Sequence, residues 1–331
     1  MPEPLGMRIS GTGSYLPERI LTNKYFEERL DTSDKWIRER TGIIERRTAG
    51  EGESTATLAA EAGKAAVADA GISADDLDLI IVATTTPEAL LPSTACYVQQ
   101  AICTRPVAAF DLNAACTGYV YALINATFML QTGHFRNILV IGAETMTRIV
   151  DPEDRATCIL FGDGAGATVL TATPDAQGSA VLHFKISAEG SGDNLLFVPA
   201  GGSRLPPSRM TIEERLHYVK MAGREVYKAA VKRNFQLVDS TLSEAGVSSK
   251  DIALVIPHQS NLRIIESVRQ RLGLPEDRMF VNIQQYGNTS AASIPIGLNQ
   301  SLRTGRVKPG DLILLIAFGA GFTWGSALIR L

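Results

Sequence analysis

The sequence predicts an α/β protein made of two similar halves. Apolar runs rich in β-forming residues alternate with helical patterns along the 331 residues, which is the pattern of an α/β fold. The runs are almost continuously apolar, which indicates sheets covered on both faces. The order and spacing of these elements in the first half return in the second half, and such a self-match predicts an internal duplication.

In the first half, strands and helices alternate on both sides of a cysteine. The predicted elements are strand 77–83, helix 93–102, strand 106–110, helix 119–130, strand 137–142 and strand 165–171. Cys116 lies between the third and fourth of these elements. It therefore occupies a junction between a strand and a helix.

The second half repeats this order around an asparagine. The predicted elements are strand 252–256, strand 279–283, a helix after Asn288, strand 312–317 and strand 325–330. About 33 residues separate the first strand from Cys116, and about 32 separate strand 252–256 from Asn288. We therefore expect Cys116 and Asn288 at equivalent helix starts.

The boundary between the halves is expected near residues 172–184, where the chain is loop-like. We assign residues 1–177 to the first half and residues 178–331 to the second. Glycine and proline interrupt residues 188–215, so this segment is predicted to be a long loop excursion of the kind that often covers a site.

Composition narrows the function classes only slightly. Hydrophobic residues make up 45% of the chain and charged residues 20%, and the formal net charge is −3. Such a charge gives no basic field for nucleic acid. The four cysteines fit neither zinc spacing nor a disulfide-rich pattern, and no metal is implied. No apolar run is long enough to span a bilayer, so we expect a cytoplasmic protein without membrane contact.

Cys116 is the first candidate for catalysis. It is surrounded by small residues, and its place before a helix favours the thiolate through unpaired N–H groups and the helix dipole. A thiolate can hold an acyl group covalently. The alternative is a small buried hydrophobic residue, as free cysteines often are.

His258 and Asn288 are the second and third candidates. His258 follows an apolar strand that ends at Pro257, and Asn288 follows Gly287 before a helix. A hydrogen-bonded core histidine and a helix N-cap are the ordinary interpretations of these residues. Three polar groups at the ends of strands or loops are, however, what a site at one sheet edge requires.

The chain resembles the β-ketoacyl-ACP synthase III family of the thiolase superfamily over essentially its whole length. The order Cys, then His-Gln-x-Asn, then Gly-Asn-Thr-Ser carries the resemblance most specifically. Further matching motifs occur at residues 11–17, 31–37, 40–43, 161–167 and 318–325. The resemblance implies a five-layered α-β-α-β-α fold and a homodimer. It also implies that the 188–215 loop covers the substrate tunnel.

The resemblance also implies an activity. The expected reaction joins an acyl-CoA primer, by default acetyl-CoA, to malonyl-ACP with release of CoA and carbon dioxide, and initiates fatty acid synthesis. Cys116 would carry the acyl group, and His258 and Asn288 would stabilise the enolate formed by decarboxylation. Backbone N–H groups of Cys116 and Ala320 would form the second oxyanion hole. CoA is a substrate here, and no cofactor is expected.

Contacts with CoA, with the carrier protein and with the acyl chain are carried over residue by residue. Trp36 and Arg155 would sandwich the adenine, because flat cationic and aromatic groups suit a base. The remaining CoA contacts are Thr32, Arg40, Gly223 and Asn261. An acidic carrier protein would meet a basic face, for which the candidates are Lys228, Arg263, Arg269 and Arg271. Leu91 would border the acyl pocket across the dimer interface.

Two other functions remain open from the sequence. One is a related acyltransferase of specialised metabolism that uses a different primer or acceptor. The other is a non-catalytic binding protein, which the presence of all three reactive positions disfavours.

Overall fold

The computed structural model describes residues 5–174 and 180–331, which form two main sheets. The first sheet has the order β1-β7-β6-β4-β5, with β4 parallel to both β5 and β6 and the other pairs antiparallel. Its strands are β1 (Gly6–Tyr15), β4 (Leu79–Ala83), β5 (Ala108–Leu112), β6 (Asn137–Thr145) and β7 (Asp163–Thr173).

The second sheet has the order β11-β12-β13-β8, with only β11 and β12 parallel. Its strands are β8 (Val181–Ala188), β11 (Leu254–Pro257), β12 (Leu312–Gly319) and β13 (Thr323–Arg330). Two small ribbons pair β2 (Ile20–Thr22) with β3 (Glu45–Arg47) and β9 (Leu196–Phe197) with β10 (Lys220–Met221).

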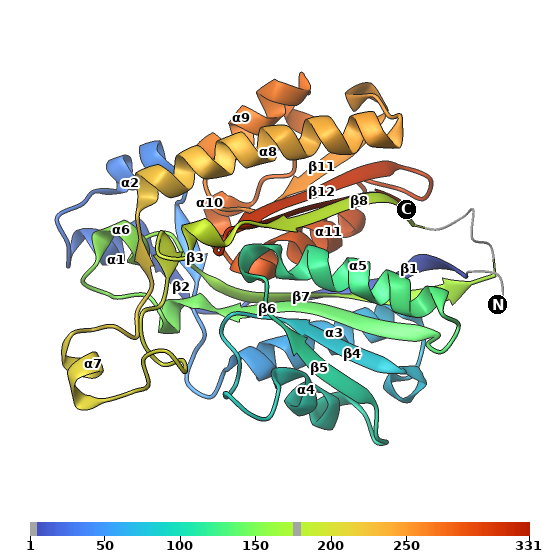
Figure 1. Cartoon of the computed structure of the whole chain (residues 1–331), viewed down its shortest axis with the longest axis horizontal. Helices are drawn as coiled ribbons and strands as arrows, with labels where there is room; N and C mark the ends of the chain where they lie inside the picture. The colour runs from blue at the N-terminus through green and yellow to red at the C-terminus, as the bar shows by residue number, and fades with distance from the viewer. Residues whose placement is uncertain (1–4, 175–179) are drawn as a thin grey trace.

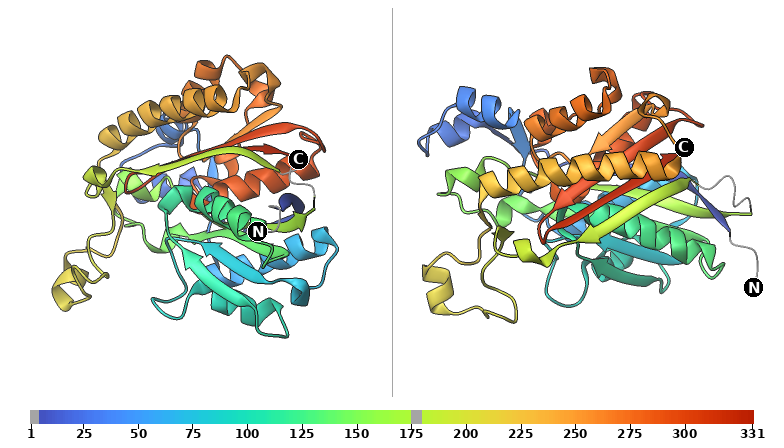
Figure 2. Two further views of the ribbon diagram at one scale, coloured as in Figure 1. Left: turned by 45° about the vertical axis from the view of Figure 1, so that its right-hand side comes forward. Right: turned by 45° about the horizontal axis from the view of Figure 1, so that its top comes forward.

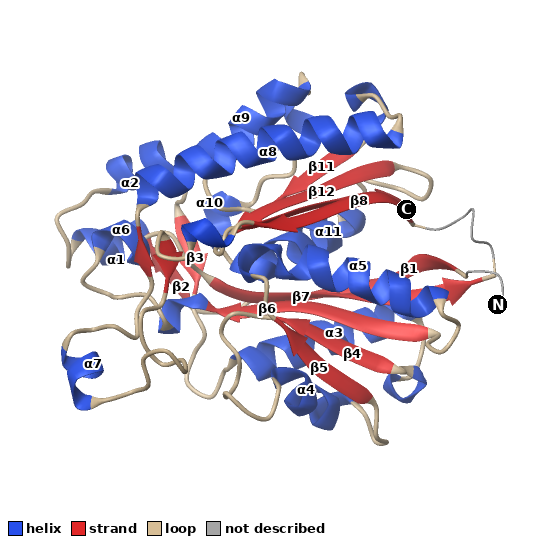
Figure 3. Ribbon diagram, in the orientation of Figure 1, coloured by secondary structure: helices blue, strands red, loops and turns tan. Residues whose placement is uncertain are grey.

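Helices cover and separate the two sheets, as Figures 1 and 3 show. Between the sheets lie α5 (Gly118–Gln131) and α11 (Ser293–Arg303). The outer face of the first sheet carries α3 (Thr55–Ala70) and α4 (Thr94–Ile102), and that of the second carries α8 (Gly223–Ala245) and α9 (Leu262–Leu272). The predicted five-layered α-β-α-β-α fold is confirmed.

The remaining helical segments are short. They are α1 (Asn23–Glu27), α2 (Asp34–Thr41), α6 (Arg155–Cys158), α7 (Arg209–Glu213) and α10 (Ile283–Tyr286). Turns of 3₁₀ helix are η1 (Ala74–Asp76), η2 (Ala115–Thr117), η3 (Met146–Arg148), η4 (Gly190–Gly192), η5 (Ser249–Asp251), η6 (Glu276–Arg278) and η7 (Ser290–Ala292). Among the described residues, no helix has both the length and the apolar composition needed to cross a bilayer.

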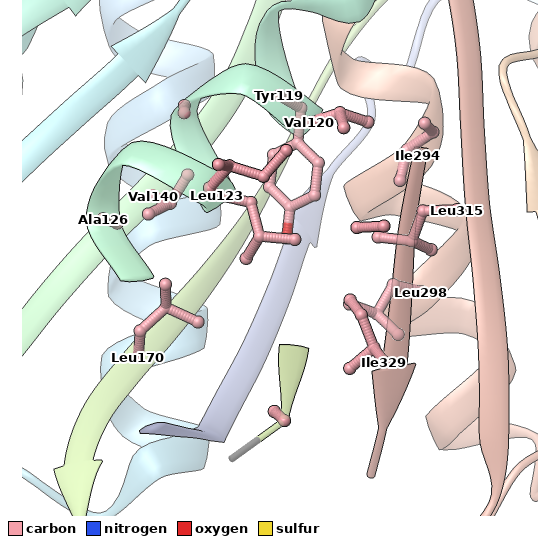
Figure 4. Close-up of a cluster of buried hydrophobic side chains, with 14 of the residues drawn as sticks. Tyr119, Val120, Leu123, Ala126, Val140, Leu170, Ile294, Leu298, Leu315 and Ile329 are labelled. Atoms are coloured by element: carbon pink, nitrogen blue, oxygen red, sulfur yellow. The ribbon is translucent and has the colours of Figure 1, made fainter. Parts of the chain in front are cut away.

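The central helices are held by a core that both sheets share (Figure 4). Helix α5 is apolar around most of its surface because it is covered on two sides. Its Tyr119 and Leu123 are fully buried, and the Tyr119 hydroxyl lies 2.9 Å from Thr168 Oγ1 of β7. Each buried side chain of this kind stabilises the fold by about 1.5–3 kcal/mol. The core therefore fixes the start of α5, where Cys116 lies.

The predicted equivalence of Cys116 and Asn288 is wrong by a few residues. The side-chain oxygen of Asn113 accepts the N–H of Ala115 at 3.1 Å, and that of Asn288 accepts the N–H of Ser290 at 2.9 Å. Ala115 and Ser290 share a left-handed backbone, with φ of 50° and 47°. Asn288 thus corresponds to Asn113, because the two turns share this hydrogen bond and this backbone conformation.

One predicted strand is also wrong. Residues 279–283 do not form a strand, and only Met279 makes an isolated parallel bridge, with Val255 of β11. Gln259 is buried, and its side-chain oxygen Oε1 accepts the backbone N–H groups of Asn282 (3.1 Å) and Ile283 (3.2 Å). A side chain thus replaces the neighbouring strand as partner of these backbone groups, and α10 begins at Ile283.

The two main sheets draw their strands from different parts of the chain, and the assignment of residues 1–177 and 178–331 to two halves stays a prediction. Every strand of the first sheet ends by Thr173, and every strand of the second begins at Val181 or later. Part of the expected boundary, residues 175–179, lies outside the described residues. The 188–215 excursion contains η4, β9 and α7, and α7 projects from the body of the molecule in Figures 1 and 2.

Candidate active site

Cys116 lies in a tight turn between β5 and α5. It is the second residue of η2, and α5 begins two residues later at Gly118. The strained backbone of Ala115 turns the chain sharply here, because a non-glycine residue with positive φ is unfavourable. Cys116 is 9% exposed, and it lines two cavities.

The end of β12 approaches the Cys116 backbone closely. A Cβ added to Gly319 would lie 2.8 Å from the Cys116 nitrogen and 3.0 Å from Thr323 Oγ1. Only glycine leaves room for this approach. Ala320 follows directly and lines the same cavity as Cys116, which places the two backbone segments named as the oxyanion hole beside one cavity.

His258 is held at the carboxyl end of β11. Its backbone N–H donates to Ile316 O at 2.8 Å, and the residue is 6% exposed. Burial lowers the pKa of the imidazole to about 3, so His258 is neutral near pH 7. A neutral imidazole offers one N–H donor and one acceptor nitrogen.

Asn288 is fixed by backbone and side-chain bonds. Its N–H donates to Leu160 O at 2.8 Å, and its carbonyl oxygen accepts Gly162 N at 3.0 Å. The side-chain oxygen accepts the Ser290 N–H, which requires an acceptor and so fixes the orientation of the amide. The amide NH₂ is therefore the end of Asn288 that can donate to a ligand.

The three candidates line one cavity of about 110 Å³. Cys116, His258 and Asn288 reach it from η2, from the end of β11 and from the loop before η7. Cys116 also lines a larger cavity of about 530 Å³, together with Leu196 to Val198 of the 188–215 excursion. The sulfur thus stands where the two spaces meet.

Electrostatics at the thiol differ from the sequence expectation. Burial raises the pKa of the Cys116 thiol to about 12, and the nearby Glu144 charge adds to the rise. The start of α5 therefore does not make Cys116 a thiolate by itself, because desolvation disfavours the charged form more strongly.

The proposed adenine contacts come together on α2 and α6. The Arg155 guanidinium carbon lies 4.9 Å from the centroid of a Trp36 ring, and that of Arg40 lies 6.0 Å away. Arg155 also donates to the backbone oxygen of Asp31, beside Thr32, whose hydroxyl is buried without a partner among the described residues. An adenine ring stacked between Arg155 and Trp36 needs a contact of about 3.5–4 Å on each of its faces. At 4.9 Å the two side chains are too close for this, so they must move apart before an adenine can enter.

The proposed pantetheine contacts border the smaller cavity. Gly223 begins α8, and Asn261 caps α9 by accepting the Arg263 N–H at 2.9 Å. The Asn261 amide also donates to Arg40 O at 3.0 Å. Both Gly223 and Asn261 line the cavity that holds the three candidates.

The four basic candidates for carrier-protein docking fall into two groups. Lys228 and Arg263 are exposed, and the Arg263 guanidinium lies 5.7 Å from the ring of Tyr227, which lines the smaller cavity. Arg269 is paired with Glu266, and Arg271 with Asp239, both at 2.5 Å. The first two are therefore freer to meet an acidic partner.

Leu91 lies away from both cavities of its own chain. It is 82% exposed in the loop between β4 and α4, next to Leu90 at 85%. Neither cavity at Cys116 includes it among its lining residues.

Sequence reasoning missed the buried acid Glu144 and its partner Ser290. Glu144 is fully buried on β6 and accepts the Ser290 hydroxyl at 2.9 Å. The available signal was a charged residue at the end of an apolar strand. Among the described residues, no group of three or more histidine, cysteine or acidic side chains could hold a metal ion.

Comparison with known proteins assigns the family. The profile described as "3-Oxoacyl-[acyl-carrier-protein (ACP)] synthase III" matches residues 110–190, and its C-terminal counterpart matches residues 242–331. "Beta-ketoacyl-[acyl-carrier-protein] synthase III" of Caldanaerobacter subterraneus subsp. tengcongensis is 49% identical over 330 residues, covering 100% of this chain and 99% of that protein.

Solved structures agree with this assignment. The crystal structure of 3-oxoacyl-[acyl-carrier-protein] synthase III from Aquifex aeolicus matches with a TM-score of 0.90 and 47% identity, covering 98% of this chain and 100% of that one. The priming β-ketosynthase of the R1128 polyketide pathway matches with a TM-score of 0.91 and 32% identity, covering 100% and 98%. The chain therefore belongs to the β-ketoacyl-[acyl-carrier-protein] synthase III family.

Proposed function

We propose that this chain condenses an acyl-CoA primer with malonyl-ACP to give 3-oxoacyl-ACP, CoA and carbon dioxide, and so initiates fatty acid synthesis. The observation that carries the proposal is the meeting of Cys116, His258 and Asn288 on one cavity. Membership of the synthase III family supports it. Acetyl-CoA is the proposed primer.

In the first half-reaction, Cys116 attacks the acyl-CoA thioester. The Sγ–C bond forms, the bond from carbon to the CoA sulfur breaks, and CoA departs. Backbone N–H groups of Cys116 and Ala320 stabilise the oxyanion of this step and the oxyanion that forms later, when the enolate attacks acyl-Cys116. Two substrates then use one site in turn, which gives ping-pong kinetics.

In the second half-reaction, malonyl-ACP loses carbon dioxide beside His258 and Asn288. Negative charge develops on the thioester oxygen as the enolate forms. The neutral His258 imidazole and the Asn288 amide donate hydrogen bonds to this oxygen, and one such donor contributes about 10²–10³ in rate. The enolate carbon bonds to the acyl carbon, the bond from that carbon to Sγ breaks, and Cys116 leaves as a thiolate that then takes up a proton.

Partner binding follows from the same assignment. The residues that bind CoA are Thr32, Trp36, Arg40, Arg155, Gly223 and Asn261. The basic face that meets the acidic carrier protein consists mainly of Lys228 and Arg263, with Arg269 and Arg271 at its edge. A homodimer covers the exposed Leu90 and Leu91 and brings Leu91 to the partner's acyl pocket. Four free cysteines suit the reducing cytoplasm.

The test is covalent labelling followed by turnover. Intact-mass measurement of the protein with acetyl-CoA should show one acetyl group, and Cys116→Ala should show none. His258→Ala and Asn288→Ala should still acylate but lose condensation with malonyl-ACP. Acetyl labelling of Cys116→Ala to the wild-type extent would refute the nucleophile assignment.

A second candidate is a priming synthase of specialised metabolism, which the similarity to the R1128 enzyme favours. A panel of acyl-CoA primers separates the two functions. Preference for acetyl-CoA supports fatty acid initiation, whereas preference for another primer or acceptor supports the second candidate.

A further inference from the structure

Glu144 is a fully buried carboxylate at the edge of the sheet that carries the candidate site. It lies near the end of β6, beyond the residues paired with β4, at the edge where parallel β4, β5 and β6 all end. Removing a lone carboxylate from water is costly unless other groups satisfy it. The hydrogen-bond partners of Glu144 therefore indicate whether its carboxyl group is ionised or protonated.

Both carboxylate oxygens of Glu144 accept hydrogen bonds. Backbone N–H groups of Thr85 and Thr86 donate at 3.1 Å to Oε2, and the Thr86 hydroxyl donates to the same oxygen at 2.6 Å. Oxygen Oε1 faces the hydroxyls of Thr85 (3.0 Å) and Ser290 (2.9 Å). A set of donors this dense favours the ionised carboxylate, although burial raises its pKa.

Ser290 lies beside both this acid and Cys116. The Ser290 hydroxyl donates its proton to Glu144 Oε1 at 2.9 Å, and Ser290 and Cys116 line the same cavity. A hydroxyl has one proton and two lone pairs. Since Glu144 takes the proton, only the lone pairs of Ser290 Oγ remain for the Cys116 thiol, and they can accept the S–H proton.

We propose that Glu144 is a positioning residue that directs the Ser290 hydroxyl to accept the Cys116 proton, so that this proton reaches Glu144 when the sulfur attacks acyl-CoA. The inference rests on the proposed function, since it needs Cys116 as the acyl acceptor. It answers a question that the site raises, because a buried thiol must lose its proton to react and the start of α5 does not remove it.

The proton balance closes over the whole cycle. As the Sγ–C bond forms, the thiol proton moves to Ser290 Oγ while the Ser290 proton moves to Glu144 Oε1, which becomes neutral. CoA leaves as a thiolate and takes a proton from solvent. When condensation breaks the Cys116–acyl bond, the expelled sulfur recovers its proton from Glu144 through Ser290.

Other titratable groups at Cys116 are less suited to this role. His258 and Tyr227 share the smaller cavity with Cys116, and Asp193 shares the larger one. His258 is buried and is used as a neutral donor in the second half-reaction. Asp193 is exposed on the loop excursion, and the Tyr227 ring lies 5.7 Å from the Arg263 guanidinium carbon.

The test compares the rate of Cys116 acylation with pH in Glu144→Gln, Ser290→Ala and wild type. Rapid-quench mixing with acetyl-CoA and intact-mass detection measures this rate without malonyl-ACP. Near pH 7 we expect both variants to be about 10²-fold slower, the usual contribution of a positioned base. The deficit should shrink about tenfold per pH unit above 7, because hydroxide then forms the thiolate directly.

Asp163→Asn is the matched control. Asp163 is also fully buried and accepts backbone N–H groups, from Ala49 and Thr147 at 2.8 Å, but it does not bond to Ser290. If Glu144→Gln does not fold, Ser290→Ala alone carries the test. Its turn tolerates alanine, since Ala115 adopts the same backbone.

Two results overturn the inference. One is acylation of both variants at the wild-type rate. The other is a deficit that stays constant with pH, as a purely structural loss would give. Neither result touches the proposed function, which fails only if Cys116→Ala still accepts the acetyl group.

Discussion

Replacing Gly319 by alanine should disable acylation while leaving the fold in place. The added Cβ would lie 2.8 Å from the Cys116 nitrogen, whereas ordinary contact begins at 3.4 Å, so the two segments must move apart by about 0.6 Å. Thr323 cannot yield easily on the other side. Its hydroxyl lies 3.0 Å from the same Cβ and is bonded to Ala114 O at 2.9 Å and to Thr117 Oγ1 at 2.7 Å.

The size of the effect follows from this displacement. Shifts on the order of 1 Å near reacting groups cost about 10²-fold in rate, and loss of one oxyanion donor costs about 10²–10³. We therefore expect Cys116 acylation in Gly319→Ala to fall about 10²-fold. Overpacking should lower the free energy of unfolding by about 1–3 kcal/mol, which a protein of this size should survive.

The assay is the single-turnover acylation rate with acetyl-CoA, read beside a urea unfolding curve. Gly202→Ala is the control, because an added Cβ there meets no atom within 4 Å. A folded Gly319→Ala protein that acylates at the wild-type rate would refute the reasoning. It would mean that the position of the Cys116 N–H does not limit the attack.

Three further predictions follow from charge and stacking. Trp36→Ala should raise the KM for acetyl-CoA by about 2- to 30-fold with little change in kcat, since one aromatic–cation contact contributes about 0.5–2 kcal/mol; an unchanged KM contradicts the adenine assignment. The His258 pKa of about 3 lies below its unfolded value near 6.5, so unfolding takes up a proton and stability falls as pH drops below 6.5. Between pH 7.5 and 5, urea unfolding should show wild type losing about 2 kcal/mol more than His258→Gln. Arg263→Glu should slow the malonyl-ACP half-reaction, and most strongly at low salt. Arg271→Glu should slow it less, because Arg271 is already paired with Asp239. Equal effects of the two variants at all salt concentrations would count against the docking face.

The sequence was sufficient for the fold because its strongest signals are local. Strand 137–142 is a run of apolar residues and lies inside β6, and the helix predicted at 119–130 is α5 within one residue at each end. Periodicity and apolar runs report how each segment is covered. Spacing then revealed the duplication that produces two sheets with helices between them.

The misassigned strand and the shifted repeat depended on long-range contacts. Residues 279–283 are apolar except for Asn282, but the Gln259 side chain takes the backbone N–H groups that a neighbouring strand would need. The correspondence of Asn113 and Asn288 is visible only in their hydrogen bonds to the next turn. Pattern counting cannot anticipate which side chain will satisfy a given backbone group.

The thiol illustrates why site chemistry is harder to predict than site location. A cysteine before a helix is expected to ionise readily, yet burial reverses that effect and raises the pKa of Cys116 to about 12. A site that keeps its nucleophile protonated at rest protects the thiol from stray electrophiles, because only the thiolate reacts quickly. Deprotonation must then be coupled to substrate binding, which calls for a base close to the sulfur but out of contact with solvent. Glu144, buried behind Ser290, meets both conditions, and the same turn that holds Ser290 also fixes Asn288. Under the proposed mechanism, one turn of the second half serves both half-reactions.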